Sequence, residues 1–325
     1  MIAPALARLP LGAHTLLRLG TDDHHVAFVP SRAGYVHQVR LRGRDLLWNY
    51  PDGAALDAND GYRNLALAPF PNRLLEGRYG WGGRELAFDV NAPDTRSALH
   101  GFGPEVAFRL ERVDLSRTAA TAYLTYLHTP ALHPASYPFA VRFDLALEVD
   151  LARASAAWRL AATNLGDGDA PVGLGWHPYF LLPGGLDAWA IEMPPNERVV
   201  LERAIPTGAR AGGLPPKRAL PIDPSWDDCL ALTDAAERTV RLVGPEYVLA
   251  LEQTAATRYT QLYVPPGDGS VAVEPMTCNV NAFADAPEEV RLAPGGRLEV
   301  GMRISVDSPC GGAAGRPPRV RRPGR

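Results

Sequence analysis

Alternation of apolar and polar residues with a period of two dominates this sequence of 325 residues. Residues 141–149 (VRFDLALEV) and 298–306 (LEVGMRISV) show it most clearly, because an apolar residue occupies every second position. Successive side chains of a β-strand point to opposite faces, so the pattern indicates strands with one buried face. Shorter runs of the same kind lie at 121–127, 155–163, 238–243, 247–253 and 269–275.

Turn-forming residues separate these runs, and the chain contains 31 Gly and 31 Pro. Amphipathic helical patterns are scarce, and residues 284–294 (ADAPEEVRLAP) predict at most one short helical turn. The sequence therefore predicts an all-β fold, a large antiparallel β-sandwich. Since no linker or internal repeat divides the chain, we expect a single domain over residues 1–309. Residues 310–325, rich in Gly, Pro and Arg, are expected to be a disordered tail.

Charge and cysteine content exclude several classes of protein. The formal net charge is −3, and the last ten residues contribute five arginines and no acid, so the remainder is more acidic still. An acidic body disfavours nucleic-acid binding. No apolar run reaches the roughly 20 residues of a membrane span, and the N-terminus lacks the pattern of a secretory signal. Three cysteines without CxxC spacing (Cys229, Cys278 and Cys310) fit a reducing cytoplasm better than a disulfide or zinc framework. A monomer and a homodimer both remain open.

Motifs for phosphate binding, nucleophilic catalysis and metal binding are missing. The sequence has no GxGxxG after a strand, no GxxxxGK[ST], no GxSxG and no HExxH. Its one lysine, Lys217, lies in the Gly/Pro-rich stretch 211–221, which argues against Schiff-base chemistry. We therefore expect neither a cofactor nor a metal.

Two polar residues stand immediately before prolines in otherwise apolar segments. His177 precedes Pro178 in GLGWHPYF (173–180), and Glu274 precedes Pro275 at the predicted end of a strand. A following proline restricts a residue to extended backbone geometry, which suits side chains that must be aimed. Strand alternation places Glu274 on the same face as Ala272, as expected of a carboxylate at a concave site. A glutamate exposed to water at the rim is the competing interpretation.

Three further residues are candidates for a site. They are Arg73 in PNR, His100 in LHG, and Asp227 in WDD. Each also has a structural interpretation when taken alone: a surface turn for the arginine, a hydrogen-bonded turn for the histidine, and a cap for the aspartate.

Together these segments resemble the aldose 1-epimerase (galactose mutarotase) family. The matching segments occur in family order between about residues 15 and 307: PNR (71–73), HG (100–101), GWHPYF (175–180), WDD (226–228), and VEPMT (273–277) followed by NAF. The resemblance implies a galactose mutarotase-like supersandwich, with Glu274 as the base and His177 as the acid. It further implies that Arg73, His100 and Asp227 bind sugar hydroxyls or the ring oxygen. The chain departs from the family at Leu230, where an aromatic residue is frequent. Asp228 remains an alternative to Asp227, because the two aspartates are adjacent.

The implied reaction exchanges the α and β anomers of a free aldohexose. The ring opens when the anomeric hydroxyl loses a proton and the ring oxygen gains one. With reference pKa values of about 4.3 and 6.5, glutamate is expected to be ionised and histidine to carry the donated proton. Negative charge in the site would raise the pKa of His177. The reaction needs no metal or cofactor.

Three alternatives remain. A glycoside hydrolase would use two carboxylates, here Asp227 and Glu274. A sugar 6-phosphate 1-epimerase would share the chemistry but need a cationic phosphate pocket. A sugar-binding sandwich without catalysis would not require a matched acid and base. Four aromatic residues either face a sugar or pack in the core: Phe102, Trp176, Tyr179 and Phe180.

Overall fold

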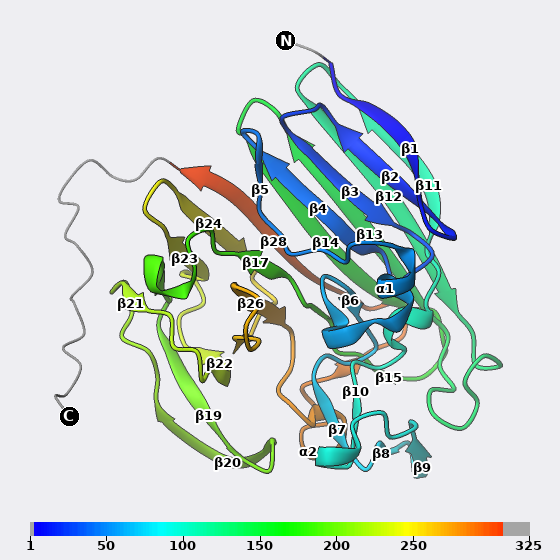
Figure 1. The fold of residues 1–325 in the computed structure, drawn as a ribbon. Helices are drawn as coiled ribbons and strands as arrows, with labels where there is room; N and C mark the ends of the chain where they lie inside the picture. The colour runs from blue at the N-terminus through cyan, green and yellow to red at the C-terminus, as the bar shows by residue number, and fades with distance from the viewer. Residues whose placement is uncertain (1–2, 308–325) are drawn as a thin grey trace, which may run out of the picture.

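Antiparallel strands build the computed structural model of the protein, which describes residues 3–307 (Figure 1). Every pairing between its named strands is antiparallel, which confirms the predicted all-β class. Each of the seven period-two runs forms a strand. These strands are β12 (Ala119–His128), β13 (Val141–Asp150), β14 (Ser155–Asn164), β23 (Thr239–Val243), β24 (Val248–Gln253), β26 (Ser270–Met276) and β28 (Arg297–Asp307).

A nine-stranded sheet forms the first layer, in the order β11-β12-β13-β14-β28-β24-β23-β18-β21. In β13 the apolar residues of the alternating pattern are buried, while their neighbours are partly or fully exposed. This sheet therefore has one face directed toward the core, as the alternation predicts. The strands not yet introduced are β11 (Arg109–Leu115), β18 (Ala190–Glu192) and β21 (Leu220–Pro221).

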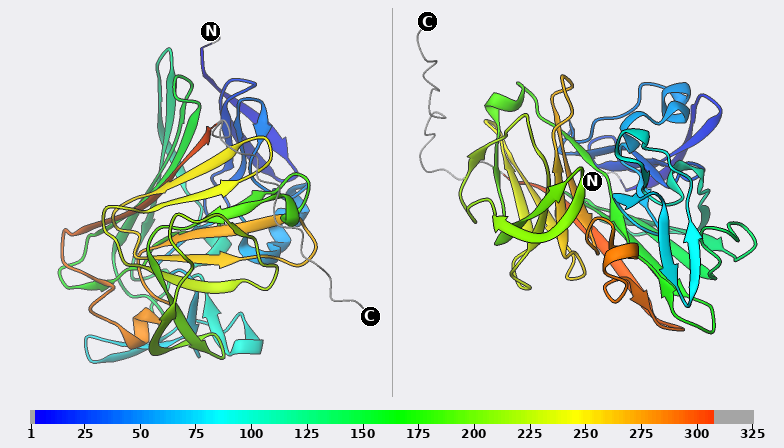
Figure 2. Two further views of the ribbon diagram at one scale, coloured as in Figure 1. Left: turned by 90° about the vertical axis from the view of Figure 1, so that its left-hand side faces the viewer. Right: turned by 90° about the horizontal axis from the view of Figure 1, so that it is seen from below.

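Two further sheets cover the inner face of the first. A five-stranded sheet in the order β1-β2-β3-β4-β5 lies against β12, β13 and β14. Its strands are β1 (Ala5–Leu11), β2 (His14–Gly20), β3 (His25–Val29), β4 (Tyr35–Leu41) and β5 (Arg44–Asp45). In the view from below, these blue strands lie to one side and the green-to-yellow strands to the other (Figure 2).

An eight-stranded sheet carries the residues of interest. Its order is β20-β19-β22-β25-β26-β16-β6, and β17 also pairs with β26. The strands are β6 (Ala66–Leu67), β16 (Gly175–Trp176), β17 (Tyr179–Leu181), β19 (Asn196–Glu202), β20 (Ile205–Gly212), β22 (Asp227–Leu232), β25 (Tyr259–Tyr263) and β26. Because β26 packs near β28, this sheet continues the second layer of the sandwich.

Short elements connect the layers. Three two-stranded ladders pair β7 (Arg73–Leu75) with β10 (Ser97–Leu99), β8 (Arg78–Trp81) with β9 (Arg84–Ala87), and β15 (Ala170–Pro171) with β27 (Arg291–Leu292). The helices are α1 (Gly53–Ala58), α2 (Ala282–Asp285) and the single 3₁₀ turns η1 (Asp60–Tyr62), η2 (Pro93–Thr95), η3 (Gly103–Glu105) and η4 (Leu186–Ala188). The helical turn expected within 284–294 is therefore displaced toward the N-terminus, since Pro287 cannot donate the hydrogen bond that would extend α2.

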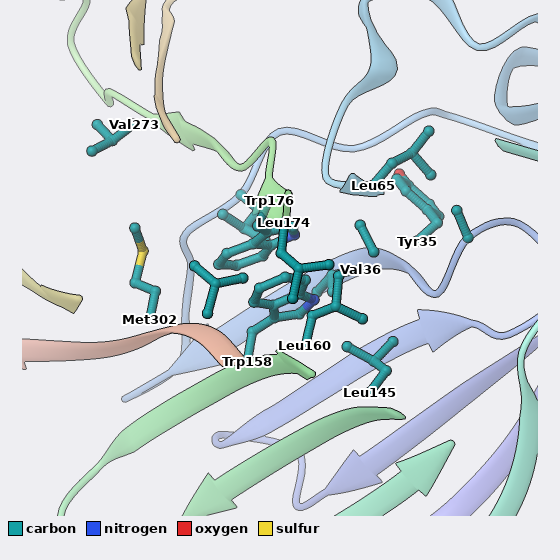
Figure 3. Close-up of a cluster of buried hydrophobic side chains, with 14 of the residues drawn as sticks. Tyr35, Val36, Leu65, Leu145, Trp158, Leu160, Leu174, Trp176, Val273 and Met302 are labelled. Carbon is teal, nitrogen blue, oxygen red and sulfur yellow. The ribbon is translucent and has the colours of Figure 1, made fainter. Parts of the chain in front are cut away.

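Two stacked tryptophans join the layers in the core. Trp158 of β14 and Trp176 of β16 lie 5.1 Å apart between ring centres, with their planes within 8° of parallel. Leu145, Leu160 and Met302 pack around them (Figure 3). Burial of such large aromatic side chains is a major source of stability. The residue immediately before His177, Trp176, is thus anchored in the hydrophobic core.

The N-terminal sheet was not predicted strand by strand from the period-two pattern. All five residues of β3 are buried, so this strand shows no alternation of apolar and polar residues. Within residues 3–307, no helix is long and apolar enough to cross a membrane, and no cluster of three or more His, Cys, Asp or Glu side chains could hold a metal ion. Cys310 and the predicted tail lie outside the described residues.

Candidate active site

One face of the eight-stranded sheet gathers the polar residues. Residues directly opposite each other in antiparallel strands share a face, and Glu274 of β26 lies opposite Gln261 of β25. Two residues along, Ala272 lies opposite Tyr263, which in turn lies opposite Asp227 of β22. The predicted placement of Glu274 beside the small Ala272 is therefore found in the structure.

Glu274 is neither at the rim nor at the end of its strand. β26 continues through Pro275 to Met276, and only 2% of the Glu274 surface is exposed. Pro275 falls between the pairing of β26 with β16, at Met276, and its pairing with β17, at Ala272, so the ladder on this side of β26 is interrupted where the proline lacks its N–H group. Oε2 of Glu274 is buried and has no hydrogen-bond partner among the described residues.

His177 occupies the break between β16 and β17 and faces Glu274. Its backbone N–H donates to the carbonyl of Leu65, and its own carbonyl accepts from the N–H of Asn64. Its ring stacks on Tyr179, with ring centres 4.9 Å apart. Nε2 of His177 lies 3.5 Å from Oε1 of Glu274. These two backbone hydrogen bonds and the stacking on Tyr179 together hold the imidazole against the carboxyl group of Glu274.

His100 lies edge-on to His177, with ring centres 5.3 Å apart. Its ring Nδ1 accepts a hydrogen bond from the backbone N–H of Asn72 at 3.0 Å. The backbone N–H of His100 in turn donates to the backbone carbonyl of Asn72. Because Nδ1 is an acceptor, a neutral His100 carries its proton on Nε2. The following Gly101 has a φ of +63°, and a side chain there would overlap with the backbone of Ala68. The HG pair thus fixes the histidine through a turn that only glycine fits.

Arg73 begins β7 and is half-buried beside the two histidines. Its Nη1 donates to Oδ1 of Asn72 at 3.3 Å, and its buried Nε has no partner in the described part of the chain. Its positive charge contributes to the lowered pKa values of His100 and His177. The same charge partly opposes the rise in the pKa of Glu274 that burial causes. The surface-turn interpretation does not describe this residue.

Asp227 connects to the same group through two amides. Its Oδ1 accepts from Nε2 of Gln261 at 2.6 Å, and Oε1 of Gln261 accepts from Nδ2 of Asn72 at 3.2 Å. Asp227 is itself exposed, whereas Asp228 pairs with Arg198 at 3.3 Å. The structure therefore brings Asp227, rather than Asp228, into the hydrogen-bonded group with His100 and Arg73.

Asn72 and Gln261 belong to this hydrogen-bonded group but were not predicted from the sequence as site residues. Asn72 stands inside the PNR motif, and its φ of +61° marks a special backbone position. Gln261 carries a weaker signal, because it shares a strand face with Tyr259 and Tyr263 as a lone amide. Only the register between β25 and β26 shows that it lies opposite Glu274.

Three of the four candidate aromatic residues belong to the core. Trp176 and Phe180 are fully buried, and Phe102 packs among other aromatic rings at 6% exposure. Tyr179 is also buried, but its ring contacts His177. Core packing is therefore the role of the first three.

The expected ionisation of the central pair is wrong in direction. Burial lowers the pKa of His177 to about 3, and the positive charges of Arg63 and Arg73 assist. Burial also raises the pKa of Glu274 well above its usual range, and the negative charge of Asp227 adds to this rise. Desolvation disfavours both charged forms and outweighs the attraction between them. Both shifts favour the neutral forms of the two groups, with a proton on Glu274 and none on His177.

Known proteins resemble this chain in sequence and in fold. The chain is 26% identical over 292 residues to the uncharacterised protein YihR of Escherichia coli K12, covering 85% of this chain and 88% of the relative. Its fold is similar to a galactose mutarotase-like protein of Clostridium acetobutylicum, with a TM-score of 0.82, 15% identity and coverage of 94% and 99%. The galactose 1-epimerase of Lactobacillus acidophilus gives a TM-score of 0.79, 13% identity and coverage of 94% and 98%.

The fold is thus the galactose mutarotase-like sandwich that the resemblance implied. The sequence model of the family described as aldose 1-epimerase matches residues 15–305, which is most of the chain. The protein belongs to the aldose 1-epimerase family.

Proposed function

We propose that the protein is an aldose 1-epimerase that interconverts the α and β anomers of a free aldohexose. The observation that carries this proposal is the buried contact between Nε2 of His177 and Oε1 of Glu274. Ring opening requires one proton acceptor and one proton donor on two oxygens of the same carbon. A histidine and a carboxyl group that face each other and share one proton meet that requirement.

In this proposal Glu274 accepts the proton of the anomeric hydroxyl, and His177 protonates the ring oxygen. The shared proton must first move from Glu274 to His177. A sugar hydroxyl that donates to the unpartnered Oε2 stabilises the carboxylate and so favours that transfer. The pair is neutral before and after the transfer, so no net charge is buried. Reclosure of the ring reverses both proton movements.

Three other residues bind the sugar in this proposal. Arg73 offers a planar set of donors, His100 offers its Nε2–H, and Asp227 accepts from hydroxyl groups. The amides of Asn72 and Gln261 link these three groups by hydrogen bonds. A linked set of this kind holds a sugar in one orientation over the acid–base pair. The cytoplasm is the proposed location, in keeping with the free, buried Cys229 and Cys278.

Exchange between anomers, followed by two-dimensional NMR, tests this function. Glucose, galactose and their 6-phosphates are each supplied with the purified full-length protein, and the spontaneous rate is subtracted. Acceleration with a free hexose supports the proposal, while acceleration restricted to the 6-phosphates would replace it with the phosphate-specific enzyme. An aryl glycoside is supplied in parallel. Its cleavage without faster anomer exchange would overturn the epimerase assignment, as would sugar binding by calorimetry without any acceleration.

A further inference from the structure

A half-buried arginine outside the proposed acid–base group lies between two aromatic rings. The guanidinium carbon of Arg63 is 4.0 Å from the ring centre of Trp48 and 4.4 Å from that of Tyr179. Its Nη1 pairs with Oδ2 of Asp268 at 2.5 Å, and only 11% of the side chain is exposed. Cations held against aromatic faces in this way are fixed in position as well as stabilised.

The segment that carries Arg63 also positions Tyr179 and His177. The Tyr179 hydroxyl donates to the carbonyl of Gly61, and the Tyr179 N–H donates to Oδ1 of Asn64. The backbone N–H of Asn64 donates to the carbonyl of His177. Residues 61–64 therefore hold the tyrosine ring on which the imidazole stacks and the imidazole's own backbone.

The charge of Arg63 is close enough to act on the imidazole. The two contacts with the Tyr179 ring place the guanidinium carbon no farther than about 9 Å from the His177 ring centre. At that distance, with an effective dielectric constant of about 20, a unit charge shifts a pKa by roughly one unit. Arg63 is the strongest charged contributor to the lowered pKa of His177. The other ionisable groups facing this imidazole among the described residues are Glu274, Arg73, His100 and Tyr179.

We propose that Arg63 is a positioning residue for anomer exchange, acting on His177 through the ring of Tyr179. This inference rests on the proposed function. The cation opposes a second positive charge beside it and so disfavours transfer of the proton from Glu274 to His177. It also fixes the plane of the ring that supports the imidazole.

The carboxylate of Asp268 determines how strongly the charge of Arg63 acts on His177, because the two side chains form an ion pair. Its Oδ1 accepts from both the N–H and the hydroxyl of Ser270, which begins the same strand that carries Glu274. The carboxylate is thereby held in place and partly neutralises Arg63. Removing the negative charge of Asp268 should therefore have the opposite effect to removing the positive charge of Arg63.

The test compares Arg63→Gln, Arg63→Lys and Asp268→Asn with the unaltered protein. The pH dependence of kcat/KM for anomer exchange reports the macroscopic pKa values of the His177–Glu274 pair. In Arg63→Gln we expect the acid limb, at which His177 takes up a second proton, to move to higher pH by roughly one unit. Arg63→Lys should return this limb toward that of the unaltered protein, and Asp268→Asn should move it to lower pH.

A role in packing alone would reduce the rate without moving the acid limb, and that outcome would overturn the inference. Titration of the His177 imidazole by ¹⁵N NMR in the absence of sugar gives a readout that does not depend on activity. If the unaltered protein exchanges no aldose, the proposed function fails. If it is active but Arg63→Gln leaves both the acid limb and the imidazole titration in place, only the inference fails. Should Arg63→Gln not fold, Asp268→Asn and Arg63→Lys decide the matter by the same measurements.

Discussion

Nε2 of His177 lies 3.5 Å from Oε1 of Glu274, and these residues are 7% and 2% exposed. That separation exceeds the roughly 2.6–3.2 Å of a well-formed hydrogen bond. The pair is therefore in contact without being locked together. A sugar oxygen that bonds to either group does not have to break a short hydrogen bond between them.

The first prediction concerns the acid limb of the pH profile. Burial lowers the pKa of His177 to about 3 and raises that of Glu274, so His177 takes up a proton only well below the ordinary range of a histidine. We expect kcat/KM to stay constant well below pH 6.5 and to fall only as His177 takes up a second proton. The measurement is polarimetry between pH 4 and 9, with the spontaneous rate subtracted. An acid limb near the reference histidine pKa of about 6.5 would contradict it.

The second prediction concerns Glu274→Gln. An amide cannot accept the anomeric proton, so we expect kcat to fall by at least roughly 10²–10⁴-fold while sugar binding stays measurable by calorimetry. Glu252→Gln, which alters an exposed glutamate of β24, is the control and should keep full activity. Turnover that survives in Glu274→Gln would remove this residue from the role of base.

The same variant should also be more stable than the unaltered protein. The raised pKa of Glu274 means that its contribution to stability is complete below about pH 4.5 and is lost as the pH rises toward its pKa in the folded protein. Glutamine has no such dependence. The gain in Tm for Glu274→Gln should therefore be larger at pH 8 than at pH 5, as measured by calorimetric unfolding. A gain independent of pH would show that the carboxyl group is not desolvated.

The fourth prediction separates two adjacent aspartates. Asp227 bonds to Gln261, whereas Asp228 pairs with Arg198. Hydrogen bonds to a charged group contribute about 1.5–3 kcal/mol, so Asp227→Asn should raise KM by roughly 10–100-fold. Asp228→Asn should change KM by no more than about twofold. Steady-state exchange rates across a range of sugar concentrations give the KM of each variant. A larger rise in KM for Asp228→Asn than for Asp227→Asn would assign the sugar contact to Asp228.

Much of the fold followed from the sequence because period two is a local signal. The seven alternating runs all became strands. In β13 the alternation matches one face in the core and one toward water, whereas β26 is buried at all of its positions. The N-terminal sheet escaped this signal at β3, where both faces are buried and no polar residue alternates. Local patterns cannot report burial that arises from packing between distant segments.

Some residues of the candidate site carry a local signal in the sequence, and others do not. His177 and Glu274 were recognisable because prolines follow them, and the structure places them in contact. Gln261 was not recognisable as a site residue, because strand register, and not the sequence around it, determines its neighbours. The ionisation of the pair was predicted with the wrong sign, because the sequence shows the nearby charges but not the loss of water around them.

The final prediction tests the turn that holds His100. Gly101 has a φ of +63°, and an added Cβ would overlap with the carbonyl of Ala68 and with the ring of Pro69. Gly83 has a φ of +75° but open space around it, so Gly83→Ala carries only the cost of the backbone conformation, about 1–2 kcal/mol. Gly101→Ala should cost more in urea unfolding and, by displacing His100, lower kcat/KM at least tenfold. If the two variants behaved alike in both measurements, the close approach at Gly101 would have no part in positioning the histidine.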